Sequence, residues 1–222
     1  MIIERESEYQ QVKSKKRVTD HGEVFTSERE VKAMLDLVKQ ETERIDSRFL
    51  EPACGTGNFL VEVLKRKLAV VQDRYKRNQL EYERHAVIAV SSIYGIDLLI
   101  DNVDECRKRL LTVFNQYYTA LYKSRCKKAC RNSAEFVLER NILRGDALTF
   151  KNDKEPIVFS EWTMVSGSLI QRRDFIFSEL TPPKMASLFH EPITSDLGQP
   201  AFIPSPVKSY PLKHFLTLAE DD

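Results

Sequence analysis

The spacing of apolar residues predicts alternating helices and short strands in the first two thirds of the chain. Ser27 and Glu30 have the spacing of a capping box, and apolar residues then recur about every 3.6 positions, which predicts a helix from about 28 to 45. The apolar run 48–50 predicts a strand. A glycine turn follows it, and then a second helix with apolar positions Leu60, Val63, Leu64, Leu68 and Val71.

The same order of elements recurs farther along the chain. The run 92–97 predicts a second strand, and the run 141–144 predicts a third that ends at Gly145. Strands separated by long helices favour parallel pairing with right-handed crossovers. The pattern therefore predicts an α/β fold, a three-layer, doubly wound, Rossmann-like domain with a mainly parallel sheet. The helix between these two strands has apolar positions Val103, Cys106, Leu110, Val113, Phe114, Tyr117 and Leu121.

Proline is distributed unevenly. Eight of the nine prolines lie from Pro156 onward, so the last part of the chain differs in character from the first. We expect an N-terminal extension over 1–20 and a ligand-binding domain over 21–150. The proline-rich tail, 151–222, is expected to complete the sheet or to bind a partner.

Composition excludes several classes of protein. The chain has 222 residues and a formal net charge of +1, with too many apolar residues for a disordered protein. Uninterrupted apolar runs are too short for a membrane-spanning helix, and charges occupy the N-terminus where a signal peptide would be apolar. Four cysteines are too few for a disulfide scaffold, and Cys126 and Cys130 have no second pair to complete a zinc site. We expect a cytoplasmic protein with no structural metal.

Polar residues at the predicted strand ends indicate a ligand. Carboxyl ends of parallel strands meet at one edge of a sheet, which brings together Glu51, Gly55, Gly57, Asp97 and Asp146. A glycine turn that enters a helix presents backbone N–H groups to a carboxylate or a phosphate. An acidic side chain after the second strand can accept ribose hydroxyls, and one after the third suits an exocyclic amine. The set predicts a ligand that contains adenosine.

Two common nucleotide motifs do not fit. A dinucleotide site requires a third glycine, but Leu60 stands at that position, and Asp97 lies 40 residues beyond Gly57 where about 20 are expected. The Gly-Lys-Ser/Thr of a P-loop is also missing. NAD and P-loop nucleotides are therefore disfavoured.

Four segments, in the right order, resemble motifs of a known enzyme class. EPACGTGNF (51–59) resembles motif I of the amino-methylating DNA methyltransferases, in particular the adenine-N6 enzymes of restriction–modification systems. HGEVFTS (21–27) resembles motif X, and YGIDLL (94–99) and RGDAL (144–148) resemble motifs II and III. The resemblance implies S-adenosylmethionine as cofactor and DNA as substrate.

The resemblance also implies roles for single residues. Phe25 and Thr26 would help enclose the methionine end of the cofactor. Its amino-acid part would be lined by Glu51, Gly55 and Gly57. Asp97 would hold the ribose hydroxyls, and Asp146 with Ala147 would meet the adenine ring. Simpler explanations remain open, since aspartates cap helices and form turns, aromatic residues fill cores and glycines make tight turns. The implied cofactor-binding residues are Phe25, Thr26, Glu51, Pro52, Ala53, Gly55, Gly57, Asn58, Phe59, Asp97, Leu98, Asp146 and Ala147.

The sequence departs from this class at motif IV. Adenine-N6 enzymes have an Asn/Asp/Ser-Pro-Pro-aromatic motif after the fourth strand, which holds a flipped base by its amino group. Here the predicted fourth strand, 156–159, is followed by Ser160, Glu161 and Trp162. Ser160 and Trp162 are candidates for the acceptor and the stacking residue, or else belong to a strand end or the core. The Pro-Pro pair at 182–183 lacks the aromatic residue.

Clustered basic residues give modest support for nucleic-acid binding. They can neutralise phosphates, although a solvated helix face is an equally simple explanation. Five of them fall within nine positions: Lys123, Arg125, Lys127, Lys128 and Arg131.

Together these patterns predict an S-adenosylmethionine-dependent methyltransferase that methylates adenine N6 of DNA in a restriction–modification context. A specificity or restriction subunit is an expected partner. One alternative is a non-catalytic cofactor-binding subunit or remnant. Another is a methyltransferase for RNA, protein or a small molecule, because cofactor motifs do not identify the acceptor.

Overall fold

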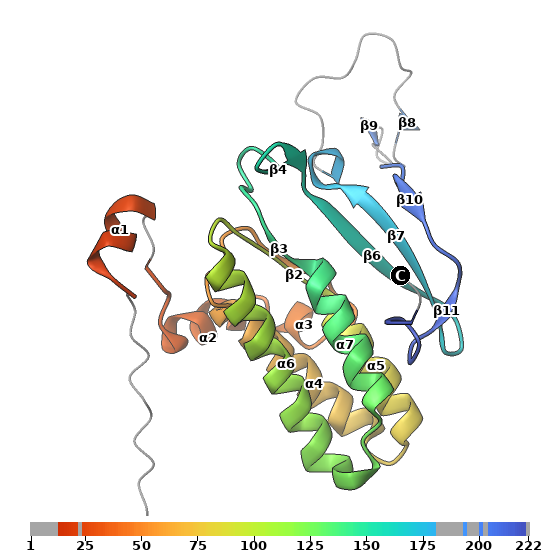
Figure 1. Cartoon of the computed structure of the whole chain (residues 1–222). Helices are drawn as coiled ribbons and strands as arrows, with labels where there is room; N and C mark the ends of the chain where they lie inside the picture. Colours follow the sequence, from red (N-terminus) through yellow and green to blue (C-terminus); the bar gives the residue numbers. More distant parts are fainter. Residues whose placement is uncertain (1–12, 22–23, 181–192, 195–199, 202–203, 221–222) are drawn as a thin grey trace, which may run out of the picture.

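A parallel three-stranded sheet lies at the centre of the structure (Figure 1). The computed structural model describes residues 13–21, 24–180, 193–194, 200–201 and 204–220. Strand β1 (Phe49–Glu51) pairs with β2 (Ile93–Asp97), which pairs with β3 (Ile142–Arg144). All three strands are parallel, so their carboxyl ends lie at one edge of the sheet, as the sequence pattern predicts.

Two long helical connections join these strands. Helices α4 (Asn58–Tyr75) and α5 (Gln79–Ser91) connect β1 to β2. Helix α6 (Ile100–Tyr122), the short 3₁₀ turn η1 (Lys123–Arg125) and α7 (Lys128–Asn141) connect β2 to β3. The α4 helix packs on α5 and α6, and α7 packs on the same two helices. Most of the apolar positions that predicted α4 and α6 are buried in this group, which confirms the periodicity as a guide to the core.

The first predicted helix is broken in two. Ser27 forms the expected capping box with Glu30, and α2 (Glu28–Asp36) begins there. The helix ends before Val38, whose φ of −119° is not helical, and α3 (Lys39–Thr42) follows. Predicting one helix to residue 45 was wrong because the chain turns at Leu37 and Val38, which are exposed, and buries Thr42 and Ile45 instead. A short helix, α1 (Lys15–His21), precedes this region.

An antiparallel hairpin follows the parallel sheet. Strand β6 (Val158–Ser166) pairs with β7 (Leu169–Ile176), and β10 (Lys208–Ser209) and β11 (Lys213–His214) also pair with β7. The remaining elements are the pairs β4 (Lys151–Asn152) with β5 (Glu155–Pro156) and β8 (Ile193–Thr194) with β9 (Pro200–Ala201), and the 3₁₀ turn η2 (Phe177–Leu180).

This hairpin covers part of the central sheet. Side chains of a strand alternate between its two faces, so Tyr94 and Ile96 lie on the face of β2 opposite to Ile93. They form a second apolar cluster with Phe159 and Phe177. In the part of the chain that is described, an antiparallel sheet therefore lies where a doubly wound fold would place a second helical layer. The predicted fourth strand is the start of β6, and it pairs with β7 and not with the parallel sheet.

The described part of the tail shares the core of the first 150 residues. Trp162, Ile170, Phe215 and Leu218 belong to the same apolar cluster as the helices α4 to α7. Among the described residues, no helix has the length and apolar character needed to cross a bilayer.

Candidate functional site

A cavity of about 450 Å³ opens at the carboxyl ends of the three parallel strands. Its size is within the range of small-molecule and cofactor sites. The walls come from the segment before α2, the turn after β1, the end of β2 and the loop after β3. Twelve of the thirteen residues that the sequence singled out line it: Phe25, Thr26, Glu51, Pro52, Ala53, Gly55, Asn58, Phe59, Asp97, Leu98, Asp146 and Ala147.

Gly57 is the exception, and it lies where α4 packs against α6. It precedes α4 with a φ of +87°, in the left-handed region that favours glycine. A Cβ atom at this position would lie 2.5 Å from Sγ of Cys106 in α6. The missing side chain therefore allows the start of α4 to approach α6.

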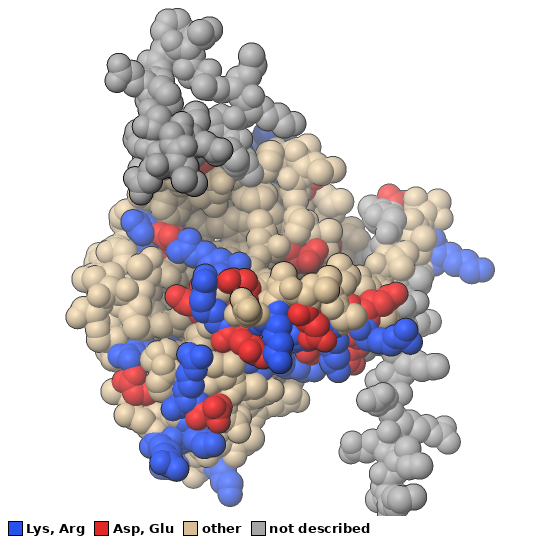
Figure 2. Space-filling view, turned by 180° about the vertical axis from the view of Figure 1, so that it is seen from behind, with Lys and Arg blue, Asp and Glu red and all other residues tan. Residues whose placement is uncertain are grey.

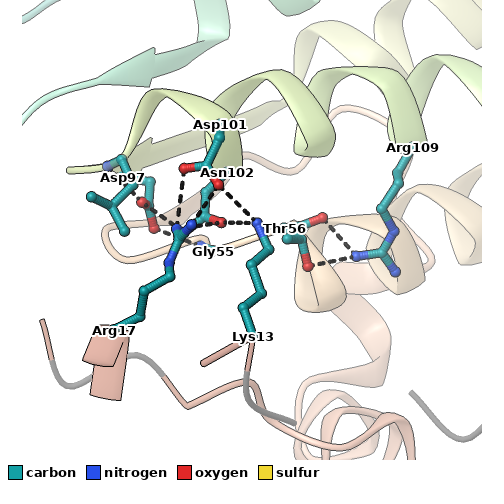
Figure 3. A network of polar contacts seen from close by, with 9 residues as sticks. Lys13, Arg17, Gly55, Thr56, Asp97, Asp101, Asn102 and Arg109 are labelled. Atoms are coloured by element: carbon teal, nitrogen blue, oxygen red, sulfur yellow. Dashed lines mark hydrogen bonds and ion pairs between the residues drawn. The ribbon is translucent and has the colours of Figure 1, made fainter. Parts of the chain in front are cut away.

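Asp97 lies at the centre of the site and organises the glycine turn (Figure 3). Its Oδ2 accepts the backbone N–H of Gly55 at 2.9 Å. Its Oδ1 accepts the N–H of Leu99 at 2.9 Å and the side-chain amide of Asn102 at 3.1 Å. Gly55 has a φ of +51°, and the ring of Phe25 lies 2.9 Å from where its Cβ would be. The end of β2, the first turn and the segment before α2 are thus held together at one point.

A second network fixes the segment before α2. The Asn58 side-chain amide donates to the backbone carbonyl of Thr26 at 2.8 Å. Arg109 of α6 donates to Asn58 Oδ1 at 2.9 Å and to the carbonyl of Thr56 at 2.6 Å. These bonds hold Phe25 and Thr26 against the glycine turn, although only the resemblance to motif X pointed to them.

Asp146 fixes the loop after β3. Its Oδ1 accepts the N–H of Leu148 at 2.9 Å, and its Oδ2 accepts the hydroxyl of Thr149 at 3.0 Å. These bonds, that of Leu148 foremost, lower the pKa of Asp146. The carboxylate therefore stays charged at the cavity wall.

Every charged side chain that lines the cavity is acidic. These are Glu51, Asp97 and Asp146, and neither lysine nor arginine is among the described lining residues. Burial raises the pKa of Glu51, and the Ala53 backbone N–H opposes this shift. Three carboxylates suit a ligand with a positive centre and disfavour a pyrophosphate, in agreement with the sequence argument against NAD.

Some lining residues were not predicted. Most of them are direct neighbours in the sequence of residues that were predicted. Asn102 is different, because it lies in the first turn of α6 and belongs to none of the recognised motifs. Its hydrogen bond to Asp97 could therefore not be predicted from the sequence. Cys54 is buried in the turn after β1, where a hydrogen bond with Cys106, and then burial, raise the pKa of its thiol. The residues that sequence reasoning missed are Val24, Cys54, Leu99, Asn102, Gly145 and Leu148.

Ser160 and Trp162 do not line this cavity. The Ser160 hydroxyl donates to Asp174 at 2.7 Å inside the hairpin, and both side chains are buried. The Trp162 indole N–H donates to Oδ1 of Asn141 at 2.9 Å, at the end of α7. The structure therefore does not bring the two candidate catalytic residues to the site, because β6 continues through the position expected for motif IV. The Pro182–Pro183 pair lies outside the described residues.

The predicted basic cluster lies at the far end of the helices. It follows the last turn of α6, whose 23 residues span about 34 Å from the pocket. Lys127 pairs with Glu83 at 2.6 Å, and Arg131 donates to Thr119 at 2.8 Å. Arg125 also lies over the ring of Tyr122, 5.6 Å from its centroid, so three of the five side chains have partners within the bundle.

One comparison with known proteins identifies the family of this chain. A family model described as the DNA-methyltransferase domain of MmeI matches residues 23–158, more than half of the chain, and the chain therefore belongs to this family. The match includes every described residue that lines the cavity. Comparisons with curated proteins and with solved structures found no match.

Proposed function

We propose that this chain binds S-adenosylmethionine and methylates N6 of adenine in DNA, in a restriction–modification context. The observation that carries the proposal is the acidic cavity at the strand ends, which lies within the segment that matches a DNA-methyltransferase domain. We take residues 21–150 as the cofactor-binding unit and 151–222 as a tail that completes its core.

The residues of the cavity suit this cofactor. Bound there, it supplies an electrophilic methyl group on a positively charged sulfonium, and three carboxylates favour a ligand of that charge. Asp97 is placed to accept hydrogen bonds from the ribose hydroxyls, and Glu51 is placed to contact the amino group of the methionine part. Asp146 and Ala147 suit the adenine end, and Phe25 closes the methionine end over Gly55.

The proposed acceptor is an adenine that leaves the DNA helix to reach the cavity, because an amino group inside a base pair is out of reach. Transfer then depends on holding the amine in line with the methyl group more than on acid–base chemistry. A specificity or restriction subunit is the proposed partner.

A second candidate follows from the placement of Ser160 and Trp162. Because both side chains are bonded inside the core, the chain could bind the cofactor and leave the holding of the base to a partner. This cofactor-binding subunit differs from the first proposal in one measurable property, which is methyl transfer by the chain alone.

Incubation of the purified chain with methyl-labelled S-adenosylmethionine and unmethylated DNA tests both proposals. Label in N6-methyladenine supports the enzyme. Label retained by protein but not transferred, and transferred once a partner is added, supports the subunit. Asp97→Asn should abolish retention, whereas Asp73→Asn, an exposed carboxylate change on α4, should not. If the wild-type chain retains no label, the cofactor assignment is wrong.

A further inference from the structure

Two cations from the N-terminal segment reach the wall of the cavity (Figure 3). Arg17 of α1 makes a bidentate contact with Asp101, at 2.6 Å and 3.1 Å. Lys13 donates to the same carboxylate at 3.2 Å. The Arg17 contact is the main cause that holds the pKa of Asp101 at about 2, so this pair is ionised at neutral pH.

The same two cations also contact a residue of the cavity. Oδ1 of Asn102 accepts Lys13 Nζ at 2.7 Å and Arg17 Nη2 at 3.3 Å. The opposite end of this amide, Nδ2, donates to Asp97. Lys13 also lies over the ring of Phe25, with 5.9 Å from Nζ to the ring centroid.

This arrangement fixes the orientation of the amide. A side-chain amide has an acceptor at one end and two donors at the other. With two cations on one side and the Asp97 carboxylate on the other, only one of its two orientations is favourable. A flipped Asn102 would turn its donors toward Lys13 and Arg17 and its oxygen toward Asp97. The cations therefore select the orientation that donates to Asp97.

We propose that Lys13 and Arg17 form a clamp that positions Asp97 through Asn102, and that the clamp strengthens binding of the ribose of the cofactor. The clamp consists of Lys13, Arg17, Asp101 and Asn102. Its two cations precede residue 23, where the family match begins. The role in cofactor binding rests on the proposed function.

Binding of S-adenosylhomocysteine and of its 2′,3′-dideoxy analogue, measured by calorimetry, tests the clamp. In Lys13→Ala/Arg17→Ala the Kd of S-adenosylhomocysteine should rise about five- to tenfold, and Arg17→Lys should retain part of the affinity. The Kd of the dideoxy analogue should stay unchanged, because it lacks the hydroxyls that Asp97 would hold. Lys16→Ala, an exposed charge change on the same helix, is the matched control.

A second measurement needs no ligand. The Gly55 N–H donates to Asp97, so loosening Asp97 should speed hydrogen exchange at this amide about three- to tenfold in the double variant and not in Lys16→Ala. An unchanged Kd for S-adenosylhomocysteine, or an equal loss for both compounds, would overturn the clamp. If the wild-type chain binds neither compound, the proposed function is wrong. Hydrogen exchange at Gly55 then tests the clamp alone, and an unchanged exchange rate in the double variant would overturn it.

Discussion

At the residue scale, Gly57 shows how a motif glycine can serve packing. An alanine there would combine a φ of +87° with a Cβ 2.5 Å from Cys106 Sγ. We expect Gly57→Ala to lower the free energy of unfolding by about 2–4 kcal/mol, measured by chemical denaturation. Gly167→Ala is the control, because its φ is +53° but nothing lies within 4 Å, and it should cost only about 1 kcal/mol.

The packing explanation for Gly57 has its own check. Cys106→Ala removes the sulfur that a Cβ at Gly57 would meet and leaves the Cys106 Cβ at 3.4 Å. The cost of Gly57→Ala should therefore fall in the Cys106→Ala background. Equal costs in both backgrounds would show that backbone strain, and not contact with α6, explains the glycine.

Glu51 should make cofactor binding depend on pH. Burial raises its pKa, so this carboxyl gains a proton at a higher pH than an exposed glutamate does. The protonated form no longer attracts a cation, so the Kd of S-adenosylmethionine should rise about three- to tenfold as the pH falls from 7.5 into the acid range. The rise should begin at a higher pH than protonation of an exposed glutamate would give. Titration calorimetry across this range is the measurement, and Glu51→Gln should flatten the curve. Parallel curves for the wild type, Glu51→Gln and the exposed control Glu155→Gln would contradict this role.

Single residues were predictable where chemistry marks the end of a strand. Asp97 ends the apolar run 92–97, and Asp146 stands two residues after the run 141–144. Gly55 occupies a turn that only glycine adopts easily. Lys67 shows the opposite case. It is fully buried in α4 and donates to the backbone carbonyls of Ile45 and Ser47. Helical periodicity places position 67 on the apolar face of α4, where a lysine is unusual. Only the packed structure shows which carbonyls its ammonium contacts.

At the scale of the element, the course of β6 places Ser160 and Trp162 in the core and away from the cavity. Both side chains bond inside the hairpin and the α7 interface, so their contribution should be to stability. Trp162→Phe keeps a ring beside Phe136 and removes the bond to Asn141. We expect Trp162→Phe and Ser160→Ala each to lower the free energy of unfolding by about 1–2 kcal/mol.

Neither variant should change the Kd of S-adenosylmethionine or any methyl transfer by the chain. Denaturation and a filter assay on the same preparations separate the two effects. Loss of transfer in Ser160→Ala, with stability and cofactor affinity kept, would return this serine to the candidate acceptors of the adenine amine.

The sequence located the elements of the parallel sheet better than those of the hairpin. Local apolar runs mark β1 to β3, and helical periodicity marks α4 and α6. These elements can be recognised because the residues that they bury are close together in the sequence. The long strands β6 and β7 carry polar and charged residues such as Arg172 and Asp174 on positions that the structure partly buries. Pairing between such strands depends on distant contacts, which residue spacing does not reveal.

At the scale of the whole molecule, folding enlarges the basic cluster. The α4–α5 turn lies beside the end of α6, since Tyr122 donates to the carbonyl of Lys76 and Gln79 donates to that of Arg125. Lys76 and Arg77 thus join the cluster at the tip of the helices, which sequence spacing could not show. On the rear face, which Figure 2 shows, basic and acidic side chains are interspersed.

This tip should contact DNA phosphates at a distance from the target base. The triple variant Lys123→Ala/Arg125→Ala/Lys128→Ala leaves the internal partners Lys127 and Arg131 in place. We expect it to weaken binding of a DNA duplex about tenfold at low salt and to reduce the slope of log K against log salt by up to about 3, as anisotropy would measure. Because α6 separates the tip from the pocket, cofactor affinity and transfer at saturating DNA should stay unchanged. Lys39→Ala, a change of an exposed lysine on α3, is the control. If the triple variant has the same salt slope as this control, the tip is a solvated surface and DNA is held elsewhere.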